Sequence, residues 1–519
     1  MNQKSNKKGL ITIISIILVI GIGAIGVYGY NQLVNKNPLV QYVTAEKNTF
    51  EETWAYYEDY YGDSKTINEK LMSDPYEATS TFSVNTDLPM QLAQADPMIG
   101  MIQGVISSLE ITTDTKVNPS TKETYIGADV AMQGNSLLDG NIYQNEENTA
   151  LQVPVLYDEY FVVNNKTFGE DLRQKGATEV PFEELPNFVD QQLSPEQLEE
   201  MAKDYLKIIS DHLSEDKVEV SEGEEYQGST YTKLSVHYTE EEVRDIFKEI
   251  LTEMKNDERF TAQFGSAEIQ KEEMDVLINN LDQLNLPNGL DYEAYMTKDY
   301  VEHRILSFDV MDTASQEEVA ITFNMDTVNK GDDQYEFNFQ VKAVPSSEDG
   351  QLLVQYSEDG SPDGEQYKVN HNLNVAFSDN QTEVDFGVEA ETVLKENNSE
   401  THFNLVVNKP EVQEIPDVSG SLIMNVSDED DKAQRDFEFG LDVAMEDPNM
   451  GPITAGVTLT GETEYTFTDN PEFPTIGENA VHVFEKSDQE LQQILKEIEQ
   501  NAMNYYQSMF GALGGMGGF

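Results

Sequence analysis

The sequence predicts an α+β protein: an N-terminal transmembrane helix, then a large extracytoplasmic body of mostly antiparallel sheet with amphipathic helices packed on it. Three observations lead to this prediction. An uncharged apolar run stands near the N-terminus, segments that alternate apolar and polar residues fill most of the chain, and a few amphipathic segments with capping residues interrupt them. At 519 residues the chain is long enough to bury a large core.

The apolar run is Leu10–Tyr28, which contains no charged residue. At about 1.5 Å per residue, a helix of this length spans the roughly 30 Å hydrocarbon core of a bilayer. Lys4, Lys7 and Lys8 precede it, so the positive-inside rule predicts a cytoplasmic tail at 1–9 and a body outside the cell. A cleaved signal peptide is the alternative, but it needs a shorter apolar core and a small-residue cleavage site.

Helical signals dominate the segments that flank and interrupt the strands. Residues 29–75 are expected to form a juxtamembrane linker and a helix. Residues 76–290 are expected to mix strands and helices, and one of these helices should begin after Thr239, with Glu242 completing a capping box.

The second half of the chain has a different pattern. From 291 to 486, apolar residues alternate with Asp, Glu, Asn and Thr, which predicts antiparallel strands with one wet and one buried face. Residues 487–510 are expected to form an amphipathic helix, and the Gly-rich end at 511–519 is expected to be a flexible tail.

Charge and composition exclude several classes of function. The chain has 97 acidic and 32 basic residues, a net charge of −65. Nucleic-acid binding requires neutralisation of phosphates and is therefore excluded, as is docking of the body on anionic lipid headgroups. The chain has no cysteine, so it has no disulfide, no lipidated cysteine and no cysteine nucleophile.

Nothing in the sequence predicts catalysis. None of the six histidines falls in an H-E-x-x-H motif, and no G-x-S-x-G or phosphate-binding loop occurs. With so many acidic residues, pairs of carboxylates arise by chance and do not identify an acid–base site. We therefore expect a protein that is not an enzyme and has no cofactor, with a calcium ion as the alternative to consider.

The calcium question arises from the acidic stretch "SEDGSPDGEQY" at 357–367. Its candidate ligands are Asp359, Ser361, Asp363 and Glu365, and Gly364 stands at the sixth position of an EF-hand-like count. The twelfth position is an asparagine, so the stretch is not an EF-hand. Two interpretations remain, a looser calcium site and the turn of a β-hairpin, and the Asp-Gly and Ser-Pro-Asp-Gly chemistry favours the turn.

The layout of the chain resembles that of single-pass surface proteins of Gram-positive bacteria. The apolar run, "LQVPVLYDEYFVVNN" at 151–165 and "KLSVHYTEEEVRDIFKEILTEMKND" at 233–257 carry this resemblance. The order of strands and capped helices is also similar to that of LolA/LppX-like envelope lipoproteins. That resemblance implies a curved antiparallel sheet around an apolar cavity for lipid.

The leading hypothesis is therefore a non-catalytic, membrane-anchored binding protein for a lipid or another hydrophobic component of the cell envelope. The stretch "PMIGMIQGVISSL" would supply an adaptable gate, because methionine-rich surfaces repack easily. The proposed gate residues are Met98, Ile99, Met101, Ile102 and Val105. The alternative is an acidic structural or interaction protein of the cell surface, stabilised by cations, whose protein partner the sequence does not identify.

Overall fold

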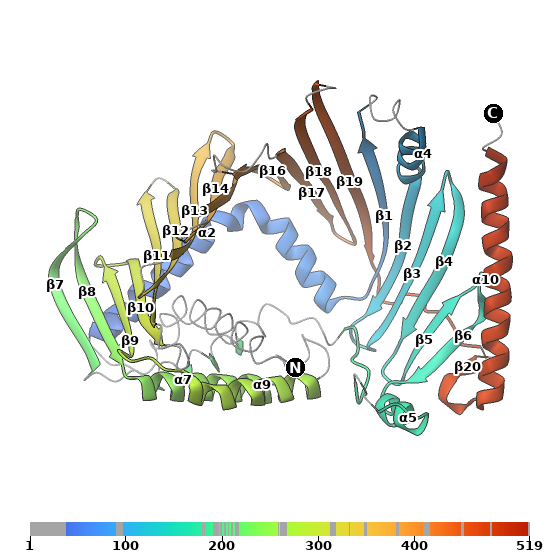
Figure 1. Ribbon diagram of the computed structural model, residues 1–519, viewed down its shortest axis with the longest axis horizontal. Coiled ribbons are helices and arrows are strands. Elements are labelled where there is room, and N and C mark those ends of the chain that lie inside the picture. The colour runs from blue at the N-terminus through green and yellow to red at the C-terminus, as the bar shows by residue number, and fades with distance from the viewer. Residues whose placement is uncertain are drawn as a thin grey trace. The chain divides into compact units, whose positions relative to one another are not determined.

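The computed structural model shows a protein built mainly from β-strands (Figure 1). It describes residues 38–89, 97–178, 180, 182–189, part of 197–212, 217–257, 259, 267–311, 318–331, 333–346, 350–379, 383–407, 416–447, 451–477 and 480–516. The chain divides into two compact units that are interleaved in sequence. The first comprises 1–61, 195–261 and 270–419, and the second 62–194, 262–269 and 420–519.

The first unit contains an antiparallel meander in which each strand pairs with the next along the chain. Its strands are β7 Val218–Tyr226, β8 Ser229–Tyr238, β9 Leu290–Met296, β10 Val301–Met311, β11 Glu318–Gly331, β12 Gln334–Pro345, β13 Gly350–Asp363, β14 Gln366–Asp379, β15 Glu383–Lys395 and β16 Asn398–Val407.

Tight turns fix the register of this meander. Gln227 and Gly228 join β7 to β8 with φ angles of 48° and 87°, as the type I′ hairpin turn requires. Gly364 lies at the first position of the two-residue turn between β13 and β14, with φ +69°. Gly228 and Gly364, which have no Cβ, therefore stand where the chain must reverse within two residues.

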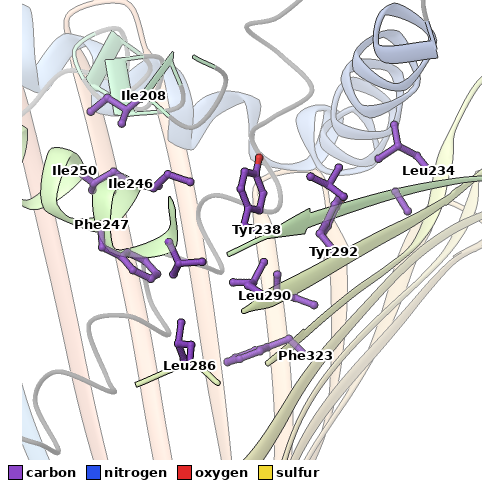
Figure 2. Close-up of a cluster of buried hydrophobic side chains, with 14 of the residues drawn as sticks. Ile208, Leu234, Tyr238, Ile246, Phe247, Ile250, Leu286, Leu290, Tyr292 and Phe323 are labelled. Atoms are coloured by element: carbon purple, nitrogen blue, oxygen red, sulfur yellow. The ribbon is translucent and has the colours of Figure 1, made fainter. Parts of the chain in front are cut away.

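Helices cover one face of this meander over β8–β11. They are α7 Glu240–Asn256, α9 Ala267–Asn280, the short helix η3 Leu281–Gln283 and the first part of α2 Pro38–Ser73. Side chains from the strands and helices form one buried cluster, part of which Figure 2 shows. Within it, Leu234, Tyr292 and Phe323 of the sheet pack with Phe247 and Ile250 of α7.

The predicted start of α7 is confirmed. The side chain of Thr239 accepts a hydrogen bond from the backbone N–H of Glu242, and the carboxylate of Glu242 accepts one from the backbone N–H of Thr239. Hydrogen bonds from Lys217 and Thr239 lower the pKa of Glu242 to about 2. The cap therefore stays charged at neutral pH and stabilises the positive end of the helix dipole.

The second unit joins strands from the two ends of the chain. β1 Tyr76–Asp87 pairs on one side with β19 Gly451–Phe467 and on the other with β2 Leu109–Asn118. The other strands are β3 Glu123–Met132, β4 Asn135–Gln144, β5 Asn148–Val153, β6 Tyr157–Asn164, β18 Lys432–Asp447 and β20 Val481–His482, with β17 Asp417–Glu429 at the unit boundary. β20 pairs with β6 in parallel, whereas β1–β19, β1–β2, β18–β19 and the consecutive pairs from β2 to β6 are antiparallel.

Helices of the second unit are α4 Pro97–Ile106, α5 Phe168–Gln174, the short η4 Val483–Glu485 and α10 Asp488–Met516. A small cluster of Tyr143, Ala150, Val162 and Ala480 is buried in this unit. The predicted C-terminal helix is present, and it continues through residue 516 into the segment expected to be a tail.

The predicted fold class is wrong. Twenty strands dominate the described residues, and helices cover only part of the sheet, so the α+β description with a transmembrane helix does not hold. None of the helices in the described ranges combines the length and apolarity needed to cross a bilayer. The apolar run Leu10–Tyr28 lies outside those ranges. The run is long enough for a transmembrane helix, but length and hydropathy alone do not establish that a segment crosses a membrane.

The predictions that depended on that helix are corrected with it. These are the single-pass topology, attachment to a membrane through the N-terminal segment, and a cell-membrane location with a cytoplasmic N-terminus and an extracytoplasmic body. Among the described residues, α2 is the helix nearest the N-terminus. It packs through Tyr42, Val43 and Ala45 into the core of the first unit and carries polar residues along its length.

A buried ion pair fixes α2 to the first unit. Arg304 of β10 donates from Nε to Oε1 of Glu46 at 2.8 Å, and Nη2 bonds to the other carboxylate oxygen. The two side chains are 3% and 2% exposed. Burial alone would lower the pKa of Arg304, but the charge and hydrogen bonds of Glu46 outweigh this effect and raise it. Arg304 is thus held in its charged form inside the protein.

We predict that Glu46→Gln lowers the free energy of unfolding by about 3–5 kcal/mol, because it leaves the Arg304 charge buried without its counter-ion. Urea titration followed by circular dichroism measures this change. Lys47→Ala is the matched control on the next residue, since its partner Glu51 is exposed and such pairs contribute about 0–1 kcal/mol. Equal effects of the two substitutions would contradict the assigned role of the ion pair.

Candidate functional site

The register of the meander places different chemistry on its two faces. Side chains alternate between faces along a strand, and directly opposed residues on neighbouring strands share a face. On the face opposite the helices, one row of opposed residues across β11–β14 consists of amides. These are Asn324, Gln340, Gln355 and Asn374.

A second polar row runs beside the first, two residues further along each strand. It crosses β11–β15 and has a carboxylate at each end, with amides and a hydroxyl between them. Its members are Asp326, Asn338, Ser357, Asn372 and Glu389.

These two rows form the floor of a pocket of about 690 Å³ in the first unit, which we call the amide groove. The tip of the β7–β8 hairpin contributes Tyr226 and Gln227, and Gly387 and Val406 of β15 and β16 lie at the other end. The volume is in the range of ligand pockets, about 300–1,000 Å³. None of the sixteen residues that line it is lysine or arginine.

Aromatic side chains pack at the β7–β10 end of the amide groove. The ring of Tyr226 stacks on Tyr295 with centroids 4.3 Å apart and an interplanar angle of 22°, and it meets the ring of His303 edge-on at 4.9 Å. Tyr295 and His303 are buried, at 8% and 3% exposure, whereas Tyr226 is half-buried and lines the groove. The buried pair thus supports Tyr226 from behind.

Hydrogen bonds hold His303 in place. Its Nδ1 lies 2.8 Å from Oδ1 of Asp326, and its Nε2 lies 3.0 Å from the hydroxyl of Tyr231. That hydroxyl also donates to Glu302 at 2.7 Å. Burial, followed by the hydrogen bond to Glu302, raises the pKa of Tyr231 to about 12. This network uses both ring nitrogens, so His303 is a fixed support behind Tyr226.

Some of the floor amides form hydrogen bonds with one another. Nδ2 of Asn324 donates to Oε1 of Gln340 at 3.0 Å. By contrast, Oδ1 of Asn374, in the same row, is buried and has no hydrogen-bond partner within the described part of the chain. A buried acceptor without a partner costs about 1–3 kcal/mol. The row therefore has unused hydrogen-bonding capacity at its β14 end.

The two groove carboxylates cannot act as a catalytic pair. Asp326 lies on β11 and Glu389 on β15, four strand intervals apart. At about 4.8 Å per interval, their backbones are roughly 19 Å apart, whereas glycoside hydrolysis needs carboxyl groups about 5–9.5 Å apart.

The acidic stretch at 357–367 forms a β-hairpin, as the turn interpretation expects. Asp359, Ser361 and Asp363 lie on β13, and only Gly364 and Glu365 form the turn. Asp359 accepts a hydrogen bond from Asn370 at 3.0 Å, and Asp363 pairs with Lys368 at 3.0 Å.

This strand geometry separates the four predicted calcium ligands. At about 3.3 Å per residue, Asp359 and Asp363 are roughly 13 Å apart along β13, too far to coordinate one ion. In the ranges that the structure describes, no three His, Asp or Glu side chains are grouped so that they could hold a metal.

The predicted gate residues do not meet the amide groove. They lie on α4 of the second unit, where Gln103 anchors the helix by donating to the backbone oxygen of Thr86 at 2.7 Å. Most of their side chains are exposed; the values are Met98 64%, Met101 71%, Ile102 51% and Val105 43%, and Ile99 is half-buried. None of them lines the 690 Å³ pocket.

The sequence analysis missed the groove residues. It identified the wet positions of the strands but not what distinguishes them. In "TFNMD", "FNFQV", "LVQYS" and "NHNLN", those positions carry mainly Asn and Gln, although the chain has 97 acidic residues to place on its surface. This excess of amides on adjacent strands was the available signal.

No family model matches the chain, and no curated protein matches it. Solved structures similar to it include Wzi of Escherichia coli, described as a carbohydrate-binding outer-membrane β-barrel of group 1 capsule assembly (8% identity, 85% of this chain, 96% of that chain, TM-score 0.27). OmpT of Vibrio cholerae is also similar, with 7% identity over 76% of this chain and 98% of that chain and a TM-score of 0.22. OccK10 of Pseudomonas aeruginosa has 5% identity over 76% of this chain and 98% of that chain and a TM-score of 0.20. TM-scores this low give no ground for assigning a function.

The LolA-like description is corrected as well. That resemblance implied an apolar cavity enclosed by a curved sheet. The 690 Å³ pocket is instead lined mainly by amides and other polar groups, on the sheet face opposite the buried core.

We predict that Tyr231 contributes to stability below pH 10 and that this contribution is lost as the pH rises to about 12. In this window the unfolded chain releases the Tyr231 proton while the folded chain keeps it, so folding becomes less favourable. Tyr231→Phe should therefore reduce the fall in unfolding free energy between pH 10 and 12, measured by urea titration at fixed ionic strength. The control is Tyr506→Phe at an exposed site, and identical curves for wild type and Tyr231→Phe would refute the prediction.

Proposed function

We propose that the chain is a non-catalytic binding protein that holds a neutral polar ligand in the amide groove. The observation that carries this proposal is the composition of the groove, in which two adjacent polar rows, made mainly of amides and with a carboxylate at each end of the second, cross β11–β15 without any basic side chain. An amide side chain offers both donors and an acceptor, so it pairs with hydroxyl or amide groups of either polarity.

The electrostatics of the groove favour a neutral ligand. Asp326 and Glu389 are the charged residues of its lining, and the chain as a whole has a net charge of −65. An anionic ligand would meet like charge with no lysine or arginine to neutralise it. A long apolar ligand would leave the amides desolvated and unpaired, at about 1–3 kcal/mol for each group.

The non-catalytic part of the proposal is supported by the roles of the groove's titratable groups. Asp326 is engaged with the His303 ring at 2.8 Å, and Glu389 is four strands away. His303, although held by a carboxylate, is 3% exposed and bonded through both nitrogens. No acid and base in the groove are therefore within hydrogen-bond reach of a common substrate atom.

A second candidate function is suggested by the other face of the same strands. Over β13–β16 it carries apolar side chains that are each more than a third exposed: Leu352, Leu373, Phe377, Val384, Phe386 and Leu405. They are continuous with the apolar face that α2 and α7 cover over β8–β11. The net charge opposes packing of a second copy here, so an acyl chain is the occupant that this face suits.

We predict that the purified chain binds members of a panel of neutral oligosaccharides and discriminates against their sulfated counterparts by at least about tenfold, because the groove has no cation. Asn338→Ala and Gln340→Ala should each weaken binding about three- to tenfold, which corresponds to one net hydrogen bond of about 0.5–1.5 kcal/mol. Isothermal titration calorimetry measures both effects.

Phe377→Ser, on the opposite face, is the control and should leave oligosaccharide binding unchanged. A fluorescent fatty acid tests the second candidate with the same variants. Fatty-acid binding that is lost in Phe377→Ser and kept in Gln340→Ala, together with no neutral oligosaccharide bound, would overturn the proposed function in favour of the hydrophobic ligand.

A further inference from the structure

We infer that the ligand of the amide groove is an extended oligosaccharide that lies across the strands, with a sugar ring at one end against Tyr226. This inference rests on the proposed function and specifies its ligand class. It is carried by three features of the groove: its length, the spacing of its polar groups, and the aromatic side chain at one end.

The groove is long and narrow. Its lining extends from β11 to Val406 of β16, and its width is set by the two polar rows, which cross β11–β15. Five strand intervals of about 4.8 Å give a length of roughly 24 Å, and two rows separated by two residues give a spacing of about 7 Å. A compact small molecule would contact only a fraction of this floor, whereas a linear chain would contact all of it.

The spacing of the polar groups matches a chain of repeating rings. Across the strands, one hydrogen-bonding side chain recurs at each interval, as Gln340, Gln355 and Asn374 do on β12, β13 and β14. Sugar rings in an extended glycan recur at a spacing of the same order as the ~4.8 Å strand interval, so about four or five rings would cover the floor. Each ring carries several hydroxyls, so one ring can form hydrogen bonds with donors and acceptors of both polar rows.

Tyr226 supplies what a sugar ring needs at the end of the chain. Sugar rings present apolar C–H faces that pack on aromatic rings, and the ring of Tyr226 is held by stacking on Tyr295 at 4.3 Å. Because Tyr295 and His303 are buried, they hold the Tyr226 side chain in place before a ligand binds. Binding therefore does not have to restrict this side chain further, which favours affinity.

An extended peptide, the other neutral chain, fits this site less well. Peptides bind sheets mainly by adding a strand to an open edge, where backbone groups are unpaired. The groove lies on the face of strands β11–β15, whose backbone groups are already paired with neighbours on both sides. Only side chains are available there, and amide side chains suit hydroxyls.

The test is a chain-length series. Starting from the sugar type that binds best in the neutral panel, oligosaccharides of two to six rings are titrated into the full chain by calorimetry. Affinity should rise with each added ring up to about four or five rings, the number set by the ~24 Å floor, and then level off. Gln355→Ala, at the centre of the floor, should weaken binding of the longest chain about three- to tenfold.

The contribution of the Tyr226 ring to binding is tested with two variants, and folding of each variant is checked independently. Tyr226→Ala should weaken binding of the longest chain about tenfold, and Tyr226→Phe, which keeps the ring, should restore it. Gln351→Ala, in β13 but outside the groove, is the matched control and should have no effect. Thermal melts check that each variant is folded.

The outcomes separate the two proposals. If a disaccharide binds as tightly as a hexasaccharide, or if Tyr226→Ala and Tyr226→Phe behave alike, the extended-chain inference is wrong while the groove remains a binding site. If no neutral oligosaccharide binds at all, the proposed function itself is wrong. A rise in affinity with chain length, together with the expected weakening of the longest chain by Gln355→Ala, supports both.

Discussion

The register of the antiparallel meander is the constraint on which the rest of the first unit depends. From β9 to β16 each strand pairs with its chain neighbour, and two-residue turns such as Gly364–Glu365 fix the offset of one strand from the next. A slip of one residue would move every side chain of a strand to the opposite face. The amides would then enter the core, and Phe323 and its neighbours would enter the groove. Stability and binding-site composition are therefore set by the same hydrogen bonds.

The two faces of the sheet have separate roles. On the apolar face, α2 and α7 bury the aliphatic and aromatic side chains of β8–β11, and the Arg304–Glu46 ion pair adds a specific attachment that hydrophobic packing alone does not provide. On the polar face, the His303 network fixes the aromatic end of the groove. The residues that line the groove include no lysine or arginine, so the groove is polar without being basic, which is consistent with a chain of net charge −65.

Local features were predictable from the sequence, and features that depend on pairing were not. The capping box at Thr239 and the hairpin at 357–367 follow from residues close in sequence, and both are present. The amide groove requires residues from β11 to β15 to be aligned within one position, which no local pattern specifies. The prediction of a membrane anchor went wrong because it extended one apolar segment into a topology for the whole protein. The resemblance to Gram-positive surface proteins stays a prediction.

The most direct test of the account is a crystal structure of the full chain with the tightest-binding neutral oligosaccharide. The account predicts electron density for consecutive sugar rings across β11–β16, hydrogen-bonded to the two polar rows, with one ring against Tyr226. Density on the apolar face of β13–β16, or an empty amide groove at a ligand concentration that saturates the protein in solution, would contradict the central claim that the register builds a binding site on the polar face.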